Sequence, residues 1–147
     1  MRRFPLIVCA AVLPIAAIAG KAPEKSGGAS KVIKRAVDLI ADGGGYIYDI
    51  PPGPRRDEAG LARNCAKSMI SHRDRLKGST GDDNPMIIIS DDPSFGARVA
   101  HGALASLQRG SLRRMKIICI LGTQYDSYLR PVATAAGARL QVEPIPK

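Results

Sequence analysis

Two kinds of segment alternate regularly along this chain. Stretches whose apolar residues recur at helical spacing are each followed by a short run of β-branched, aromatic or other apolar residues, in the order α-β-α-β-α-β-α-β. Strands separated by helices pair in parallel through right-handed crossovers, since a short hairpin turn cannot join parallel neighbours. The alternation therefore predicts an α/β fold, a small three-layer sandwich with a four-stranded, mostly parallel sheet.

The predicted strands are the four short runs 46–50, 86–89, 117–121 and 139–143. The second and third runs contain no polar residue, which is typical of strands covered on both faces. Helices on both faces predict a flavodoxin-like or Rossmann-like sheet with the strand order 2-1-3-4. Hydrophobic residues make up 45% of the 147 residues, which is enough for one core.

Residues with capping or helix-breaking chemistry bound the predicted helices. Serine and aspartate accept hydrogen bonds from the first N–H groups of a helix, proline suits its first position, and glycine closes it in the left-handed conformation. The predicted boundaries are a cap at Ser30 and a stop at 43–45, a helix within 57–77, an opening at Asp92-Pro93 with a stop at Gly110, and a helix 128–136 between Ser127 and Gly137.

Residues 1–19 have the composition of a secretory signal peptide. Arg2 and Arg3 precede the apolar stretch 6–18, and cleavage is expected after Ala19, where a small-x-small pattern ends. A membrane anchor needs about 20 apolar residues, and this stretch is shorter, so a cleaved signal is favoured over an anchor. The expected location is the bacterial periplasm or the extracellular space, with no stable membrane insertion after cleavage.

Beyond the expected cleavage site the chain divides into a leader and one domain. Residues 20–30 are rich in Gly, Ser and Lys without periodicity, which predicts a flexible leader, and residues 31–147 form the single α/β domain. Disulfides persist in exported proteins. Cys65 and Cys119 are the cysteines of this domain, and two interpretations stay open for them: one disulfide that closes a long loop, or two buried free thiols.

Polar residues follow the first three predicted strands. Ligands of parallel sheets bind beyond the carboxyl ends of the strands, near the point where the strand order reverses. The loops at that edge are expected to bring acidic, basic and hydroxyl side chains together. The candidate ligand-binding residues are Asp49, Arg55, Arg56, Asp91, Asp92, Thr123 and Asp126.

Two chemistries suit these loops. Clustered carboxylates suit Mg²⁺, and the arrangement resembles the acidic strand-end sites of metal-dependent phosphohydrolases and nucleases, although Ile50 and Pro51 after Asp49 depart from the DxD motif of one such group. Helix N-termini beside Arg55 and Arg56 suit an anion. No glycine-rich phosphate loop follows a predicted strand, and no complete nucleophilic constellation occurs in the sequence.

Basic residues are in excess, with 22 Lys+Arg against 13 Asp+Glu and a net charge of +9. Arg109, Arg113, Arg114 and Lys116 follow the third helix, so they are expected at the edge of the sheet opposite the acidic loops. Such a group suits an acidic partner protein, an anionic envelope polymer or nucleic acid, while a solubilising surface explains it equally well. Sequence-specific nucleic-acid recognition is not expected, because none of its motifs is present.

Taken together, the sequence predicts a secreted, periplasmic, non-catalytic accessory or binding module without a cofactor, which engages an envelope partner protein or a small anionic ligand. The alternative is a small Mg²⁺-dependent phosphoester hydrolase that uses Asp49, Asp91 and Asp126, with Arg55 or Arg56 stabilising negative charge. A domain that binds a nucleotide or sugar phosphate without turnover is a third, weaker hypothesis.

Overall fold

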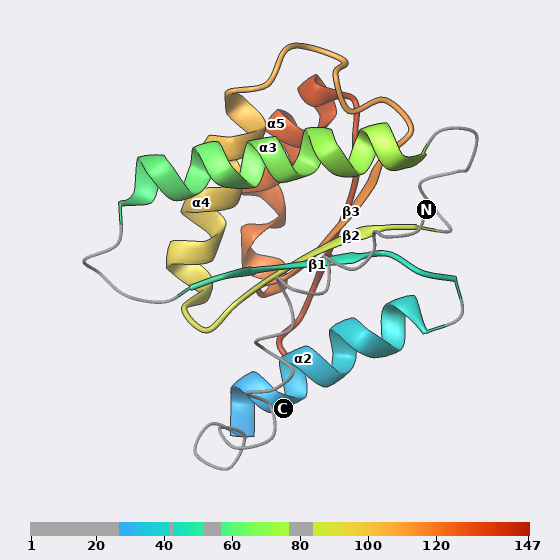
Figure 1. Cartoon of the computed structure of the whole chain (residues 1–147). Helices are drawn as coiled ribbons and strands as arrows, with labels where there is room; N and C mark the ends of the chain where they lie inside the picture. Colours follow the sequence, from blue (N-terminus) through green and yellow to red (C-terminus); the bar gives the residue numbers. More distant parts are fainter. Residues whose placement is uncertain (1–26, 42, 52–56, 77–83) are drawn as a thin grey trace.

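A computed structural model describes residues 27–41, 43–51, 57–76 and 84–147 of the chain. The predicted signal peptide 1–19, residues 20–26 of the predicted leader, and the candidates Arg55 and Arg56 lie outside the described residues. Figure 1 shows one sheet with helices on both of its sides.

The predicted alternation of helices and strands is confirmed. In chain order the elements are α2 (Gly27–Ile40), β1 (Tyr46–Ile50), α3 (Glu58–Leu76), β2 (Met86–Ser90), α4 (Pro93–Ala105), β3 (Lys116–Ile120), the 3₁₀-helix η2 (Thr123–Tyr125), α5 (Asp126–Ala136) and β4 (Arg139–Glu143). Within the described part of the chain, no helix combines the length and the apolar character needed to cross a membrane.

The four strands pair in parallel in the order β1-β2-β3-β4. The flavodoxin-like α/β class with a parallel sheet is thus confirmed, but the predicted strand order 2-1-3-4 is wrong. Crossovers of one hand that all step in the same direction must place their helices on one face. Accordingly α3, α4 and α5 lie on one face of the sheet and α2 on the other (Figure 1).

Alternating strand residues build one apolar core on each face of the sheet. The larger core lies under α3, α4 and α5 and includes Ile88 of β2 and Ile117 of β3. The smaller core lies under α2, and its buried members are Val32, Ala36, Ile87, Ile89, Ile118 and Ile120. The two central strands are therefore covered on both faces, as their apolar runs predict, while β1 and β4 are the edges of the sheet.

Two predicted helix boundaries are confirmed by their cap geometry. Asp92 Oδ1 accepts a hydrogen bond from Phe95 N at 3.1 Å, and Pro93 is the first residue of α4. Gly137 follows α5 with a φ of 94°. A Cβ at Gly137 would lie 3.1 Å from Gly110 Cα, so the loop before β3 approaches the end of α5 closely only because residue 137 is glycine.

Three other predicted boundaries are wrong. Helix α2 begins at Gly27, so Ser30 lies inside it rather than capping it. Helix α4 ends at Ala105, and Gly110 lies in the loop that follows. Helix α5 begins at Asp126, directly after η2, so Ser127 is inside the helix. Neighbouring turns of helical or 3₁₀ conformation extend or shorten a helix by a few residues without changing the apolar pattern that predicts it.

Candidate functional site

The loops after β1, β2 and β3 lie at one edge of the sheet, since the strands are parallel. A ligand crevice opens at such an edge where the strand order reverses and neighbouring crossovers run over opposite faces. The order β1-β2-β3-β4 contains no reversal among the described strands. The described strands therefore lack the reversal of strand order from which the candidate ligand-binding residues were inferred.

Asp49 and Asp91 are the two candidates that the structure brings within electrostatic reach of each other. Partial loss of hydration raises the pKa of Asp49 to about 6, and repulsion from the Asp91 carboxylate adds to this shift. Both side chains are exposed, so Asp49 retains part of its contact with water. The pair forms a small acidic feature at the carboxyl ends of β1 and β2.

The other described candidates have different surroundings. Asp92 is occupied as the cap of α4. Asp126 forms a bidentate ion pair with Arg130, with Oδ2–Nη2 and Oδ1–Nε distances of 2.6 Å and 2.7 Å, and this hydrogen bonding lowers the pKa of Asp126. Thr123 is an exposed residue at the start of η2. Asp92 and Asp126 therefore make contacts within the fold that account for their positions.

The predicted metal triad of Asp49, Asp91 and Asp126 is therefore wrong as a geometric arrangement. By strand alternation Asp49 lies on the α2 side of the sheet, whereas Asp126 begins α5 on the opposite side. No group of three or more His, Cys, Asp or Glu side chains in the described segments could hold a metal ion. The alternative hypothesis of a hydrolase loses the three-aspartate geometry from which it was derived.

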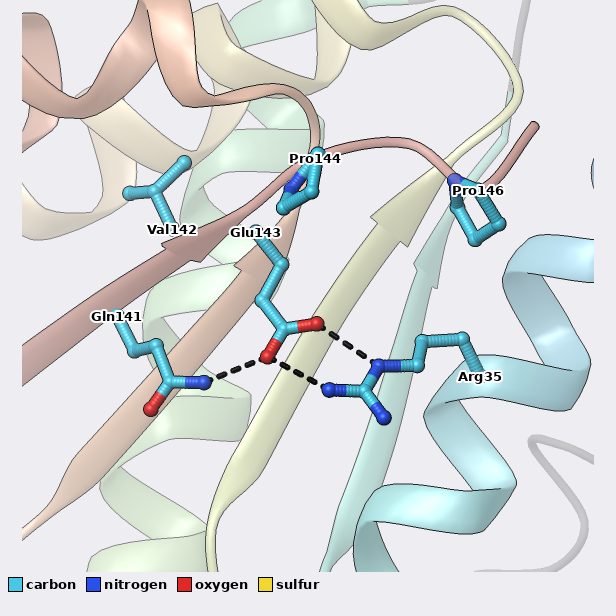
Figure 2. Close-up of a pocket in the computed structure, with 6 residues that line it drawn as sticks. All are labelled: Arg35, Gln141, Val142, Glu143, Pro144 and Pro146. Atoms are coloured by element: carbon cyan, nitrogen blue, oxygen red, sulfur yellow. Dashed lines mark hydrogen bonds and ion pairs between the residues drawn. The ribbon is translucent and has the colours of Figure 1, made fainter.

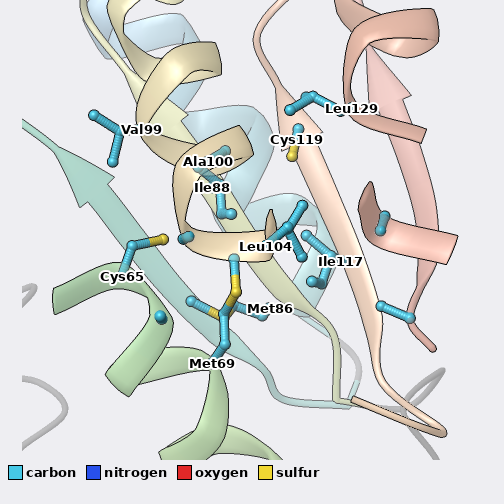
Figure 3. Close-up of a cluster of buried hydrophobic side chains, with 14 of the residues drawn as sticks. Cys65, Met69, Met86, Ile88, Val99, Ala100, Leu104, Ile117, Cys119 and Leu129 are labelled. Carbon is cyan, nitrogen blue, oxygen red and sulfur yellow. The ribbon is translucent and has the colours of Figure 1, made fainter. Parts of the chain in front are cut away.

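Cys65 and Cys119 are buried and are not bonded to each other in the structure. Figure 3 shows them on α3 and β3, with Ala100 and Ile88 drawn between them. Burial raises the pKa of both thiols, that of Cys119 to about 12. Thiols that stay protonated inside an apolar core are poor nucleophiles and metal ligands.

His72 and His101 also have structural surroundings. His72 Nε2 lies 2.7 Å from the Asn84 carbonyl oxygen, and its ring stacks on Tyr46 with the centroids 5.9 Å apart. Burial lowers the pKa of His72, so its neutral form is favoured in the folded protein. His101 stacks on Tyr128 with a centroid distance of 4.3 Å. Both rings therefore link neighbouring elements of the fold.

Basic side chains gather at the opposite, amino-terminal edge of the sheet. The C-terminal end of α3 meets the loop between α4 and β3 there, because Arg73 Nη1 donates to the Ser111 carbonyl oxygen at 3.0 Å. The Arg75 guanidinium lies 5.8 Å from the ring centroid of Tyr46, at the start of β1. We define the basic edge as Arg73, Arg75, Arg109, Arg113, Arg114 and Lys116.

The loop that carries three of these arginines is firmly held. Gly110 N donates to Ala135 O at 2.9 Å and Leu112 N to Ala136 O at 2.7 Å, which ties the loop to the end of α5. The side chains of Leu112 and Met115 are fully buried. Arg114 adopts a φ of 74°, a conformation that non-glycine residues keep only where the surroundings enforce it. The exposed arginines therefore project from a fixed backbone.

The carboxylates of the described chain cluster mainly toward the other end of the strands. Asp49, Asp91, Asp126 and Glu143 lie at or just beyond the carboxyl ends of β1, β2, β3 and β4. At the basic edge, Asp74 is paired with Arg73 at 2.8 Å. At the carboxyl-terminal end, by contrast, Arg35, Arg63, Arg98 and Arg130 pair with Glu143, Asp57, Glu58 and Asp126, so both signs of charge are present there. Among the described residues, the excess of cations therefore lies at the basic edge.

A hollow of about 510 Å³ lies beside β4 on the α2 side of the sheet. Its walls come from Arg35 of α2, from β4 and from the C-terminal segment (Figure 2). Arg35 Nε and Nη2 donate to Glu143 Oε1 and Oε2 at 2.8 Å and 3.0 Å, and this pairing lowers the pKa of Glu143. Sequence reasoning missed this site because its partners are 108 residues apart.

Searches against models of protein families, curated proteins and solved structures find no match for this chain. The described residues form a small parallel α/β domain whose basic edge includes a loop tied to α5 by backbone hydrogen bonds.

Proposed function

We propose that this chain is an exported, non-catalytic binding module that engages the acidic surface of a partner protein in the cell envelope through the basic edge. The observation that supports the proposal is the anchored loop of Arg109, Arg113 and Arg114. Charged side chains on a fixed backbone lose less conformational entropy on binding than those on a mobile segment. Arginine suits this role because its planar guanidinium binds carboxylates through two parallel hydrogen bonds.

An acidic protein surface fits the basic edge better than a small anion does. The cations extend from Arg75 beside β1 to Lys116 at the start of β3, so they are spread along several elements rather than converging on one point. Spread charges favour an extended partner and speed up its diffusional association. The export that brings the module to the envelope is part of the proposal and rests on residues 1–19.

Binding to a fluorescent oligo-glutamate peptide tests the proposal. A variant with Arg109→Ser, Arg113→Ser and Arg114→Asn removes three charges of the loop, and asparagine tolerates the left-handed backbone at position 114. We expect its affinity to fall about tenfold or more, with a weaker dependence on salt.

A charge-matched control separates the basic edge from net charge. Lys34→Ser, Arg63→Ser and Lys67→Ser remove three exposed charges from α2 and from the outer part of α3. The control should bind the peptide nearly as well as the wild-type protein. Equal losses in both triple variants would show that net charge, and not the basic edge, attracts the peptide.

The export part of the proposal has its own measurement. Expression of the full chain in a bacterium, followed by N-terminal sequencing of the protein from the periplasm and the medium, should give Gly20 as the first residue. Retention of the intact N-terminus in the cell would contradict the proposed location but leave the binding proposal standing.

The hydrolase alternative keeps one feature that supports it, the proximity of Asp49 and Asp91. If this pair holds Mg²⁺, the metal should raise the melting temperature of the wild-type protein and leave that of an Asp91→Ala variant unchanged. An equal response of the two proteins to Mg²⁺ would leave this alternative without support.

A further inference from the structure

Strand β4 forms an open edge of the sheet, beside which no further strand of the described chain pairs. Arg139 N donates to Met115 O at 2.9 Å, and Glu143 O accepts from Gly122 N at 2.9 Å, so these backbone groups face β3. The backbone N–H and C=O groups of successive residues in a strand point alternately to its two sides within the sheet. Those of Arg139 and Glu143 point toward β3, so those of Leu140 and Val142 point away from it. An edge of this kind is a template for another strand.

The sequence of β4, Arg-Leu-Gln-Val-Glu, is complementary to itself in the antiparallel direction. When two copies are centred on Gln141, each Arg139 lies opposite Glu143 of the second copy, and each Leu140 lies opposite Val142. We propose that two copies of this chain associate through antiparallel pairing of their β4 strands, which forms a continuous eight-stranded sheet about a two-fold axis at Gln141.

The outward backbone groups fit this register. In an antiparallel ladder, residues directly opposite each other alternate between hydrogen-bonded and non-hydrogen-bonded pairs. When the two strands are centred on Gln141, Leu140 of one copy and Val142 of the other form a hydrogen-bonded pair. These are the residues whose N–H and C=O groups face outward from the sheet. If one strand were shifted by one residue, each residue whose N–H and C=O groups face outward would lie opposite a residue whose groups face β3, and the two could not exchange hydrogen bonds. The Leu140 carbonyl oxygen accepts from Arg130 Nη1 at 3.3 Å and has a second lone pair for the partner strand.

Side-chain positions on the α2 face support the same register. Arg139, Gln141 and Glu143 alternate to this face, because Leu140 and Val142 pack against the core under α5. The hollow beside Glu143 provides room for the Arg139 side chain of the second copy (Figure 2). The Glu143 carboxylate accepts two bonds from Arg35 and one from Gln141. Since a carboxylate has about four acceptor positions, one remains for the incoming arginine.

The ends of β4 limit the pairing to a closed dimer. Pro144 follows the strand and has no N–H group, so it ends the ladder. The chain then turns toward α2 (Figure 1), where Lys31 Nζ donates to the carbonyl oxygen of Lys147 at 2.8 Å. Within the described segments, no strand pairs with the outer edge of β4. Pairing of one patch with itself satisfies both edges and stops at two copies.

Charge reversal provides the first test, with the dissociation constant of the dimer measured by sedimentation velocity over a concentration series. Arg139→Glu alone and Glu143→Lys alone each create two like-charge pairs per dimer, and we expect about tenfold or more weakening in both. A mixture of the two variants restores both opposite-charge pairs across the interface, so it should form heterodimers more tightly than either variant forms homodimers. Full wild-type affinity is not expected, because Glu143→Lys also removes the pairing with Arg35 in its own chain. Lys67→Glu on α3 is the control for net charge and should leave dimerisation unchanged.

A cysteine at the two-fold axis tests the register independently. Opposed residues of a non-hydrogen-bonded pair have Cα atoms about 4.5 Å apart, a separation that a disulfide can span. Gln141→Cys should therefore give an oxidised covalent dimer, whereas Leu140→Cys, whose counterpart lies farther along the partner strand, should not. Cys65 and Cys119 are buried and do not compete. A Cys9→Ser background removes the remaining thiol.

Several outcomes would overturn the proposal. One is a wild-type protein that stays monomeric at every soluble concentration, with no cross-link from Gln141→Cys. Another is assembly into larger polymers, which would indicate pairing of β4 with β1 of the next copy. A third is mixing of the two charge variants without recovery while circular dichroism shows both to be folded.

Discussion

The Ser111 hydroxyl oxygen is buried and has no hydrogen-bond partner among the described residues. Burying an unpaired hydroxyl costs free energy that its removal recovers. We therefore expect Ser111→Ala to raise the free energy of unfolding by about 1 kcal/mol, as measured by urea denaturation. The main chain at this position keeps its role, because Arg73 binds the carbonyl oxygen and not the side chain.

The same substitution at Ser90 is the matched control for Ser111. Ser90 Oγ donates to Asp92 O at 3.0 Å and accepts from Asp92 N at 3.2 Å, so Ser90→Ala removes both bonds from the turn before α4. We expect Ser90→Ala to lower the free energy of unfolding by about 1–3 kcal/mol. Equal effects of the two substitutions would contradict the assignment of Ser111 as the unpaired hydroxyl.

Asp49 gives a pH dependence whose sign follows from its surroundings. Its pKa rises from 3.8 to about 6 on folding, so the folded state binds more protons than the unfolded state between these values. The contribution of Asp49 to stability is therefore complete below about pH 4 and is lost as the pH rises through 6. Asp49→Asn should remove this loss, so that the variant gains stability over the wild-type protein from pH 4 to pH 7 in thermal denaturation. Identical pH dependences of stability in the wild-type protein and the Asp49→Asn variant would contradict a raised pKa of Asp49 in the folded state.

At the scale of elements, the cap of α4 separates a structural role for Asp92 from a role in ligand binding. Asp92→Ala removes the acceptor of the Phe95 N–H group and should destabilise the protein by about 1 kcal/mol. Asp92→Asn retains a side-chain oxygen at this position and should lose only a few tenths of that amount. Chemical denaturation of the three proteins measures the difference. If Asp92→Asn lost as much stability as Asp92→Ala, the charge of Asp92 and not its capping hydrogen bond would be the source of the stabilisation.

The elements themselves could be predicted because their signals are local. The pattern of Tyr46–Ile50 and Arg139–Glu143 indicates strands with the observed bounds, and the Asp92-Pro93 pair marks the start of α4. The strand order could not be predicted in this way. The hand of each crossover is fixed by the twist of the strands, but the direction in which it steps depends on which sheet edge the helix covers, and no single segment encodes that choice.

At the scale of the whole molecule, the candidate site was only partly predictable. The separation of basic and acidic loops follows from strand polarity, so the basic character of residues 109–116 could be inferred from the sequence. The junction of Arg73 with Ser111 and the pairing of Arg35 with Glu143 could not, because each depends on how α2 and α3 pack on opposite faces. For the same reason, the convergence of Asp49 and Asp126 was predicted wrongly, since they lie on opposite faces.

The two buried thiols report on how cooperatively the whole domain unfolds. Cys65 lies in α3 and Cys119 in β3, and both belong to the core between the sheet and α3, α4 and α5. A thiol reagent can reach them only when this core opens, and burial keeps them protonated while it is closed. In a Cys9→Ser background, we therefore expect both cysteines to be labelled at one common rate that reflects global unfolding.

A core substitution calibrates this measurement. Leu104 is almost fully buried in the same core, and Leu104→Ala should cost about 2–5 kcal/mol. Because each 1.4 kcal/mol changes an equilibrium about tenfold, the variant should label both thiols at least about tenfold faster, which mass spectrometry of the intact protein and its peptides resolves. Faster labelling of Cys65 than of Cys119 would show that α3 opens on its own. An unlabelled protein two hydrogens lighter than expected would instead reveal a disulfide, and with it a core in which α3 moves closer to β3 than in the structure.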